Sequence, residues 1–250
     1  GVGDDKGGLV VIIQALRAMR AAGTLDSADI IVVLTGDEER VGDPVSSARA
    51  SLSAAGQWAD AALEGRGTPR IAEARQIRTW NLSSLWRLPV DGGAAWLKVV
   101  PPFFAHEGGV LERLAPGIGP PVIARDGPRV LLAEVAGEDR YDATGAVLLR
   151  MVSILVSLQA DWSSRTDELL ALGAPDWRLS PLEALAEDVV ARTAHELDPS
   201  DVRVLEALVR NLPERLDEVA ACGIPDTLVH GDFHPGNVRG TDDRLVLLAW

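Results

Sequence analysis

Short runs of apolar residues, bounded by glycine, proline or polar turn residues, follow one another through the middle of the chain. Runs of this length that are rich in β-branched and aromatic residues are typical of strands. A hairpin signal, Asp91-Gly92-Gly93, separates two of them, and residues 104–114 have the pattern of a helix. The pattern predicts five strands in this region, at 77–80, 85–88, 95–100, 122–124 and 130–134.

From residue 143 onward the spacing of the apolar residues changes. Between 143 and 221 it is mainly the spacing of amphipathic helices, and two further strands are predicted at 227–229 and 245–248. A region of strands followed by a region of helices is typical of an α+β fold. The sequence therefore predicts two lobes, a small lobe at 76–137 and a large lobe at 138–250.

The first 65 residues have a different pattern. A helix is predicted at 7–23, a buried strand at 30–34 and a second helix at 45–55, an order that is typical of an α/β layer. Two glycines and a proline between residues 65 and 69 indicate a linker, which we place at 66–75. The sequence thus predicts a partial α/β segment, 1–65, ahead of the two lobes.

Composition narrows the class of protein. Hydrophobic residues make up 47% and charged residues 24%, and the longest apolar runs are too short to cross a bilayer, so we expect no membrane partner. A net charge of −13 argues against nucleic acid as a partner. The single cysteine, Cys222, excludes an internal disulfide and favours the cytoplasm, and we expect its side chain to be buried.

Residues 230–237 read His-Gly-Asp-Phe-His-Pro-Gly-Asn and lie between two predicted strands. Phosphoryl transfer needs a carboxylate near the acceptor hydroxyl and oxygen ligands for Mg²⁺. Asp232 and Asn237 have the spacing with which the catalytic loop of protein kinases supplies both. The segment resembles the catalytic loop of the aminoglycoside/choline-kinase-type phosphotransferase family, and the resemblance covers residues 76–250.

The resemblance implies a two-lobed, protein-kinase-like fold and a small-molecule kinase. Such an enzyme transfers a phosphoryl group from ATP, with Mg²⁺, to a hydroxyl group of a small-molecule acceptor. The resemblance makes Asp232 the catalytic residue and Asn237 the metal ligand. It also implies a set of nucleotide-binding residues: Lys98, and Glu107 to hold that lysine (with Glu112 as a second candidate). The resemblance further implies a hinge at 134–137, at the end of the small lobe, where the backbone of Val135 and Ala136 would bind the adenine.

The chain departs from this family at Ala249. Family members place a second metal-binding Asp here, and alanine cannot coordinate Mg²⁺. The resemblance also implies helices beyond residue 250 that would close over the acceptor, so the large lobe is expected to be truncated. We therefore expect an impaired kinase, and a non-catalytic nucleotide-binding module is an alternative function.

Residues 1–65 resemble a second family, the acetylornithine-deacetylase/succinyl-diaminopimelate-desuccinylase type of zinc peptidase. The resemblance rests on two acidic motifs, GDDKGG from residue 3 and GDEE from residue 36. It implies a metal-bridging carboxylate at Asp4, a general base at Glu38 and a zinc ligand at Glu39. Zinc sites of this kind also use histidine, and no histidine precedes His106. We therefore expect these positions to be non-functional, and a zinc-dependent amidohydrolase is the other alternative function.

Overall fold

The computed structural model describes residues 46–80, 83–241 and 243–248. The chain divides into two compact units, 1–40 and 41–250, and every described residue belongs to the second. The helix predicted at 7–23 and the strand predicted at 30–34 lie outside the described residues, as do Asp4, Glu38, Glu39 and Ala249.

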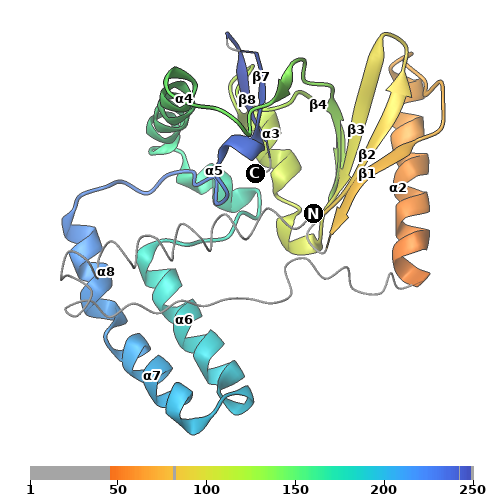
Figure 1. The fold of residues 1–250 in the computed structure, drawn as a ribbon. Coiled ribbons are helices and arrows are strands. Elements are labelled where there is room, and N and C mark those ends of the chain that lie inside the picture. The colour runs from red at the N-terminus through yellow and green to blue at the C-terminus, as the bar shows by residue number, and fades with distance from the viewer. Residues whose placement is uncertain (1–45, 81–82, 242, 249–250) are drawn as a thin grey trace. The chain divides into compact units, whose positions relative to one another are not determined.

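A five-stranded antiparallel sheet forms the first part of the described chain (Figure 1). Its strands pair in the order β1-β2-β3-β5-β4, and each contains most or all of one predicted run. Gly92, with a φ of 76°, makes the turn between the second and third strands, as the hairpin signal predicted. The strand bounds are β1 Arg75–Trp80, β2 Ser83–Val90, β3 Gly93–Val99, β4 Val122–Asp126 and β5 Arg129–Ala133.

The two faces of this sheet are buried in two different cores, because successive side chains of a strand point to opposite faces. In β5, Leu131 packs into one core, whereas Val130 and Leu132 on either side of it pack into the other. The first core is completed by helix α2 (Ser46–Gly65), which lies along the sheet in Figure 1.

Helix α2 is longer than the helix predicted at 45–55. Its buried residues Ala55, Ala59 and Leu63 follow a four-residue spacing and contact Leu131 and its neighbours on the sheet. The sequence analysis assigned residues 46–65 to the segment ahead of the lobes, whereas the structure gives them a core in common with the sheet. The boundary predicted at residue 65 therefore separates a helix from the sheet against which it packs.

The second core joins the sheet to helix α3 (Glu107–Arg113) and to the helical region. A 3₁₀ turn at Pro102–Phe104 precedes α3, so the helix predicted at 104–114 begins later than expected. Helix α4 (Ala146–Trp162) contributes Met151, Leu158 and Trp162 to this core, and each of them is nearly inaccessible to solvent.

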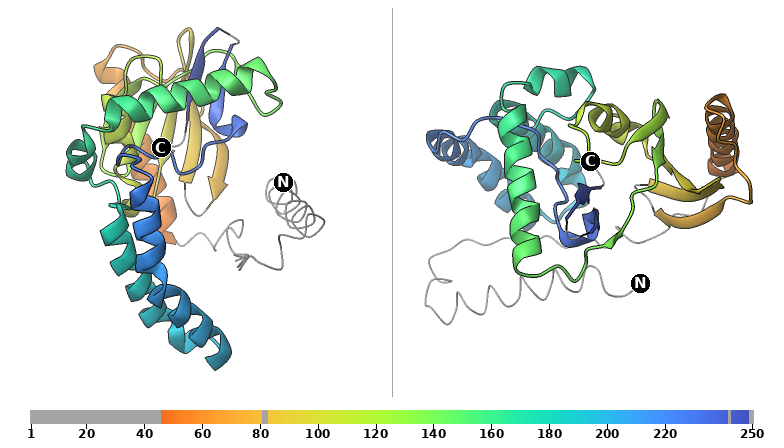
Figure 2. Two further views of the ribbon diagram at one scale, coloured as in Figure 1. Left: turned by 90° about the vertical axis from the view of Figure 1, so that its left-hand side faces the viewer. Right: turned by 90° about the horizontal axis from the view of Figure 1, so that it is seen from above.

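The helical region continues after α4 with α5 (Thr166–Ala171), α6 (Leu179–Thr193), α7 (Pro199–Arg210) and α8 (Leu212–Ala221). Helices α6, α7 and α8 contact one another and lie side by side in Figures 1 and 2. Cys222 follows α8 and is exposed, so the expectation of a buried thiol was wrong. No helix among the described residues is long and apolar enough to cross a bilayer.

A small second sheet carries the segment with the phosphotransferase-like motif. It consists of β6 (Glu138–Asp139), β7 (Val238–Gly240) and β8 (Leu245–Leu247), paired in that order. The strand predicted at 227–229 is absent from the structure, since this stretch has no strand pairing. The hydroxyl of Thr227 donates instead to the carbonyl of Gln159 on α4, so the stretch is attached to a helix and not to a sheet.

Candidate active site

Asp232 and Asn237 lie together at the tight turn before β7. The side-chain amide of Asn237 donates to the carbonyl oxygen of Asp232 at 2.8 Å and to its Oδ2 at 2.7 Å. The backbone N–H of Asn237 donates to the carbonyl of His234 at 3.0 Å, which closes the 3₁₀ turn Pro235–Asn237. The Asp232 side chain remains 72% exposed, so a ligand in solvent can reach its carboxylate.

His234 stabilises this turn from its N-terminal end. Its Nδ1 accepts a hydrogen bond from the backbone N–H of Gly236 at 3.0 Å. Because Nδ1 is the acceptor, the neutral ring carries its hydrogen on Nε2. That nitrogen lies 3.7 Å from Oδ2 of Asp232, on the side of the carboxylate. His234 therefore supports the loop.

Gly236 is required by the space around it. A Cβ at this position would lie 2.6 Å from Cε1 of His234 and 2.6 Å from Cε1 of Tyr141. Real Cβ contacts are not this short, so any larger residue would displace one of the two rings. Glycine at 236 therefore lets the turn form without displacing either ring.

His230 lies on the buried side of the same loop. It is 6% exposed, and its ring meets the ring of Phe233 edge-on, with 5.8 Å between the centroids. Burial is the main cause that lowers the pKa of His230 below its usual value of 6.5, so the ring is neutral at neutral pH. A neutral, buried ring is suited to fixing the start of the loop rather than to exchanging protons with solvent.

Lys98 and Glu107 form the second pair. Lys98 lies directly opposite Val130 across β3 and β5, so its side chain points to the face that carries α3. Its Nζ lies 2.5 Å from Oε1 of Glu107, the first residue of α3. The exposed fractions of the two side chains are 17% for Lys98 and 3% for Glu107. The other candidate, Glu112, pairs instead with Arg125 at 2.6 Å.

The predicted hinge, residues 134–137, connects β5 to β6. The carbonyl of Val135 accepts a hydrogen bond from Nε of Arg239 at 2.9 Å. Ala136 follows and is exposed, and Gly137 has a φ of 97°, a conformation that side chains disfavour. The hinge is therefore in direct contact with β7, the strand that follows the catalytic loop.

Two backbone hydrogen bonds connect the catalytic loop and β8 to the rest of this fold. The N–H of Leu248 donates to the carbonyl of Asn237 at 2.8 Å, and the N–H of Leu247 donates to the carbonyl of Ile118 at 2.7 Å. Ile118 lies between α3, which carries Glu107, and β4. The strand beside the catalytic loop is thus tied to the connection that follows the helix of the Lys98–Glu107 pair.

The donor atoms of the loop suit a hard cation. Asp232 offers a carboxylate and Asn237 an amide oxygen, and oxygen donors are the ligands that Mg²⁺ prefers. Among the described residues, no cluster of three or more His, Cys, Asp or Glu side chains is placed to hold a metal ion. The loop therefore fits Mg²⁺ that is held partly by substrate phosphates, as is usual for this ion.

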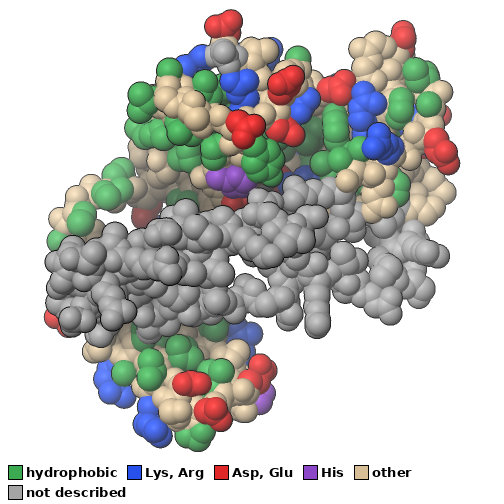
Figure 3. Space-filling view, in the orientation of Figure 1, with side chains coloured by type: hydrophobic (Ala, Val, Ile, Leu, Met, Phe, Trp, Pro, Cys, Tyr) green, Lys and Arg blue, Asp and Glu red, His purple; other side chains and the backbone are tan. Residues whose placement is uncertain are grey.

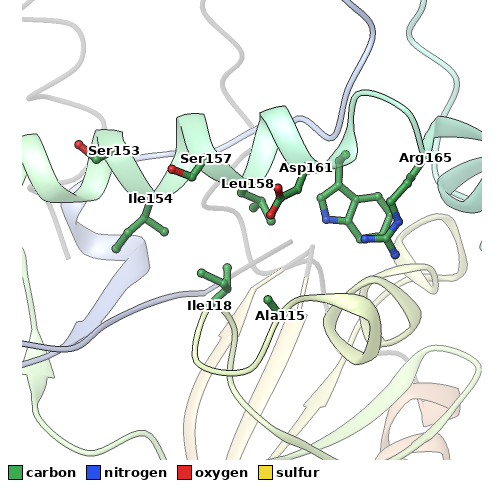
Figure 4. Close-up of a pocket in the computed structure, with 9 residues that line it drawn as sticks. Ala115, Ile118, Ser153, Ile154, Ser157, Leu158, Asp161 and Arg165 are labelled. Atoms are coloured by element: carbon green, nitrogen blue, oxygen red, sulfur yellow. The ribbon is translucent and has the colours of Figure 1, made fainter.

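A cavity of about 270 Å³ lies elsewhere, between α4 and the connection from α3 to β4. Ile154 and Leu158 of α4 lie opposite Ile118 across it (Figure 4). Its lining includes neither the catalytic loop nor Lys98 and Glu107. We therefore place the candidate active site at the loop and the ion pair, not at this cavity.

Side chains of both charges lie on the surface of the described residues. Figure 3 shows acidic and basic side chains interspersed over the described part of the visible face, rather than a continuous basic patch.

Two residues near the site were missed by the sequence analysis, Arg239 and Tyr141. Neither residue belongs to a motif, because each meets the site through a tertiary contact between residues that are far apart in the sequence.

The chain is similar to several solved structures, including two macrolide 2'-phosphotransferases. The macrolide 2'-phosphotransferase MphH from Brachybacterium faecium has a TM-score of 0.54 and 16% identity, over 76% of this chain and 70% of that one. A macrolide 2'-phosphotransferase type I has a TM-score of 0.51 and 15% identity, over 88% of this chain and 73% of that one. These similarities, together with the mixed helices and sheets, confirm the predicted α+β fold of the protein-kinase type.

A search of curated proteins gave no match. A family model, by contrast, matches residues 37–247 and is described as the phosphotransferase enzyme family (APH). The matched range begins ahead of the predicted linker and includes Glu38 and Glu39, two of the three positions that the sequence analysis related to a zinc peptidase. Nothing in the comparisons supports a zinc-peptidase segment. Because the match spans most of the sequence, the chain belongs to the phosphotransferase enzyme family.

Proposed function

We propose that the chain transfers the terminal phosphoryl group of ATP to a hydroxyl group of a small molecule. The observation that carries this proposal is the pairing of Asp232 with Asn237 on one tight turn, at 2.7 Å between Oδ2 and Nδ2. The turn supplies an exposed carboxylate and an amide oxygen side by side, the two groups that phosphoryl transfer requires. Membership of the phosphotransferase family supports the same reaction.

In this proposal Asp232 is the catalytic residue. Its exposed carboxylate accepts a hydrogen bond from the acceptor hydroxyl and orients that oxygen for attack. Asn237 is the metal ligand: both hydrogen bonds of its NH₂ group go to Asp232, which leaves Oδ1 as the atom for a cation. Mg²⁺ bound there would neutralise charge on the phosphates.

Lys98 and Glu107 are proposed to act on the nucleotide. An ammonium group has three donors, and Glu107 takes one of them at 2.5 Å. The others are suited to phosphate oxygens, while the buried carboxylate of Glu107 fixes where the ammonium lies. The backbone of Val135 and Ala136 is proposed to contact the adenine.

The acceptor is proposed to be a small molecule with a hydroxyl group. Two of the solved structures that are similar to this chain are macrolide 2'-phosphotransferases, which supports a small-molecule acceptor without identifying it. The net charge of −13 continues to disfavour nucleic acid as a partner. The single cysteine supports our proposal that the chain functions in a reducing cytoplasm.

The proposal is tested first by nucleotide binding. MgATP should raise the melting temperature of the wild-type chain, and Lys98→Ala should lose this shift because it removes the phosphate-binding ammonium. Arg192→Ala is the matched control: it removes a cation from an equally short ion pair, with Asp188 at 2.5 Å, on helix α6. Equal shifts in wild type and Lys98→Ala would contradict the assignment of Lys98.

Transfer is then measured with a panel of hydroxylated small molecules and labelled ATP. Wild type should label at least one acceptor, and Asp232→Asn should abolish labelling while MgATP still binds. If wild type binds MgATP but labels no acceptor in the panel, the non-catalytic nucleotide-binding module becomes the better explanation. Stoichiometric zinc in the purified chain, lost on mutation of Glu39 but retained in Asn237→Ala, would instead favour the amidohydrolase alternative.

A further inference from the structure

Arg239 connects the catalytic loop to the hinge. It lies two residues after Asn237 on β7, and its guanidinium reaches back across more than one hundred residues of sequence. Its Nε donates to the carbonyl of Val135 at 2.9 Å, and its Nη1 donates to Oδ1 of Asp139 at 2.8 Å. One side chain thus binds both the hinge, at Val135, and strand β6 directly after it, at Asp139.

The backbone around Arg239 holds the hinge close to β7. Asp139 pairs with Arg239 and Glu138 pairs with Gly240 in the β6–β7 ladder. A Cβ on Gly137 would lie 2.4 Å from the backbone of Gly240, so the hinge and β7 touch at two glycines, where neither segment has a side chain. The hydrogen bond from Arg239 to Val135 therefore extends a contact that the ladder and the glycines have already made.

This hydrogen bond fixes the orientation of one peptide group. The carbonyl of Val135 and the N–H of Ala136 belong to the same planar peptide unit, and the described chain has no cis peptide bonds. In a trans peptide the C=O and the N–H point in opposite directions. Because the carbonyl of Val135 points toward Arg239, the N–H of Ala136 points away from it.

The charge on Arg239 makes the restraint stronger than a neutral contact would. Hydrogen bonds from a guanidinium are charge-assisted, and the planar guanidinium holds its two acceptors in a fixed relation. The two side chains of the ion pair with Asp139 are partly exposed to solvent, 32% for Arg239 and 54% for Asp139. Such a pair contributes little by itself, so the hydrogen bond to the Val135 carbonyl is the important contact.

We propose that Arg239 is a positioning residue for the nucleotide base: it turns the Val135–Ala136 peptide so that the N–H of Ala136 donates to the base, while the carbonyl of Val135 is reserved for the guanidinium. This inference rests on the proposed function, since it requires ATP to bind along residues 134–137. It also narrows the proposed adenine contact from the backbone of both residues to one donor, the Ala136 N–H.

The test separates the base from the phosphates. Titration calorimetry measures the affinity of wild type and Arg239→Leu for MgATP and for magnesium tripolyphosphate, which has no base. Arg239→Leu should weaken MgATP binding about tenfold, which corresponds to ~1.4 kcal/mol. It should leave tripolyphosphate binding within about twofold, because Arg239 orients only the base-binding peptide. A merely structural role would weaken both ligands together.

Two further variants complete the design. Arg239→Lys retains a positive charge near Asp139 but cannot form the forked pair of hydrogen bonds. It should therefore weaken MgATP binding nearly as much as Arg239→Leu does. It also carries the test should the leucine variant fail to fold. Asp139→Asn removes the exposed ion pair while Arg239 can still donate to Val135, so its MgATP affinity should stay within about twofold of wild type.

The outcomes distinguish this inference from the proposed function. If wild type binds MgATP and both Arg239 variants bind it equally well, the positioning role is wrong and the proposed function stands. If the variants lose MgATP and tripolyphosphate equally, Arg239 is a general structural residue and the inference is again wrong. If wild type binds no MgATP, the proposed function fails, and this inference fails with it.

Discussion

The buried ion pair between Lys98 and Glu107 makes the sharpest prediction about stability. Replacing Lys98 with methionine keeps the aliphatic part of the side chain and removes its charge. It leaves the carboxylate of Glu107, whose side chain is 3% exposed, without its ammonium partner. Two unit charges 2.5 Å apart attract by roughly 6–7 kcal/mol at an effective dielectric constant of about 20, before desolvation is subtracted.

The net effect is smaller than this attraction but still large. Removing one partner of a buried pair costs about 3–5 kcal/mol, because an uncompensated charge remains buried. Since Lys98 is 17% exposed, we expect the lower end, a loss of about 3 kcal/mol in the free energy of unfolding for Lys98→Met. The double variant Lys98→Met/Glu107→Gln has no buried charge to compensate and should lose only about 1 kcal/mol.

Chemical denaturation of the wild type, the two single variants and the double variant gives the coupling energy, provided that the denaturant slope stays constant. Arg192 and Asp188 on α6 supply a matched control, because their ion pair has the same 2.5 Å separation but is 66% and 57% exposed. The same cycle there should give a coupling of about 0.3–0.5 kcal/mol. If the Lys98 and Glu107 changes are additive within about 0.5 kcal/mol, the reasoning from burial is refuted.

Three further predictions follow from particular contacts. Gly236→Ala should lower the free energy of unfolding by about 1–3 kcal/mol, because its Cβ would overpack against His234 and Tyr141. The control Gly56→Ala, in the middle of α2 with nothing within 4 Å of its new Cβ, should raise the free energy of unfolding by up to ~1 kcal/mol. Equal denaturation midpoints for the two variants would contradict the steric argument. Burial lowers the pKa of His106 below its usual 6.5, so the unfolded chain binds this proton more readily than the folded chain does. The free energy of unfolding should therefore fall as the pH falls below 6.5, by up to ~1.4 kcal/mol per pH unit. His106→Gln should reduce this slope in denaturation curves recorded from about pH 7 to about pH 5, and an unchanged slope would assign the effect to other groups. Ala249→Asp should tighten MgATP binding at least about tenfold in calorimetry, because the new carboxylate would follow Leu248, whose N–H already donates to the backbone of Asn237. Unchanged MgATP affinity in a folded variant would mean that residue 249 lies away from the metal.

The parts of the fold that the sequence predicted are those that depend on local patterns. The five strands of the first sheet were predicted because apolar runs between turn residues have a strand's length, and the described structure has a strand at each. The failures occurred where tertiary contacts override local preference. Residues 227–229 have a strand-like composition, but the hydroxyl of Thr227 is hydrogen-bonded to α4. Cys222 follows α8 and is exposed to solvent, although free cysteines are usually buried.

The sequence by itself determined which functional groups the loop at residues 230–237 brings together. Asp232 and Asn237 are five positions apart on one tight turn, so their spacing nearly fixes their distance. Local spacing can reveal such a site because few backbone dihedrals separate its groups. The roles of these residues toward ATP and Mg²⁺ stay predictions until binding is measured.

Only the tertiary structure decided which distant residues meet. It paired Lys98 with Glu107 and gave Glu112 to Arg125, although both glutamates lie in the same helix. It packed α2 on the sheet and brought Arg239 to the Val135 carbonyl, a residue that no motif marks. These contacts depend on which face of each strand or helix is buried and on how the elements pack, and a one-dimensional pattern gives the faces but not the partners.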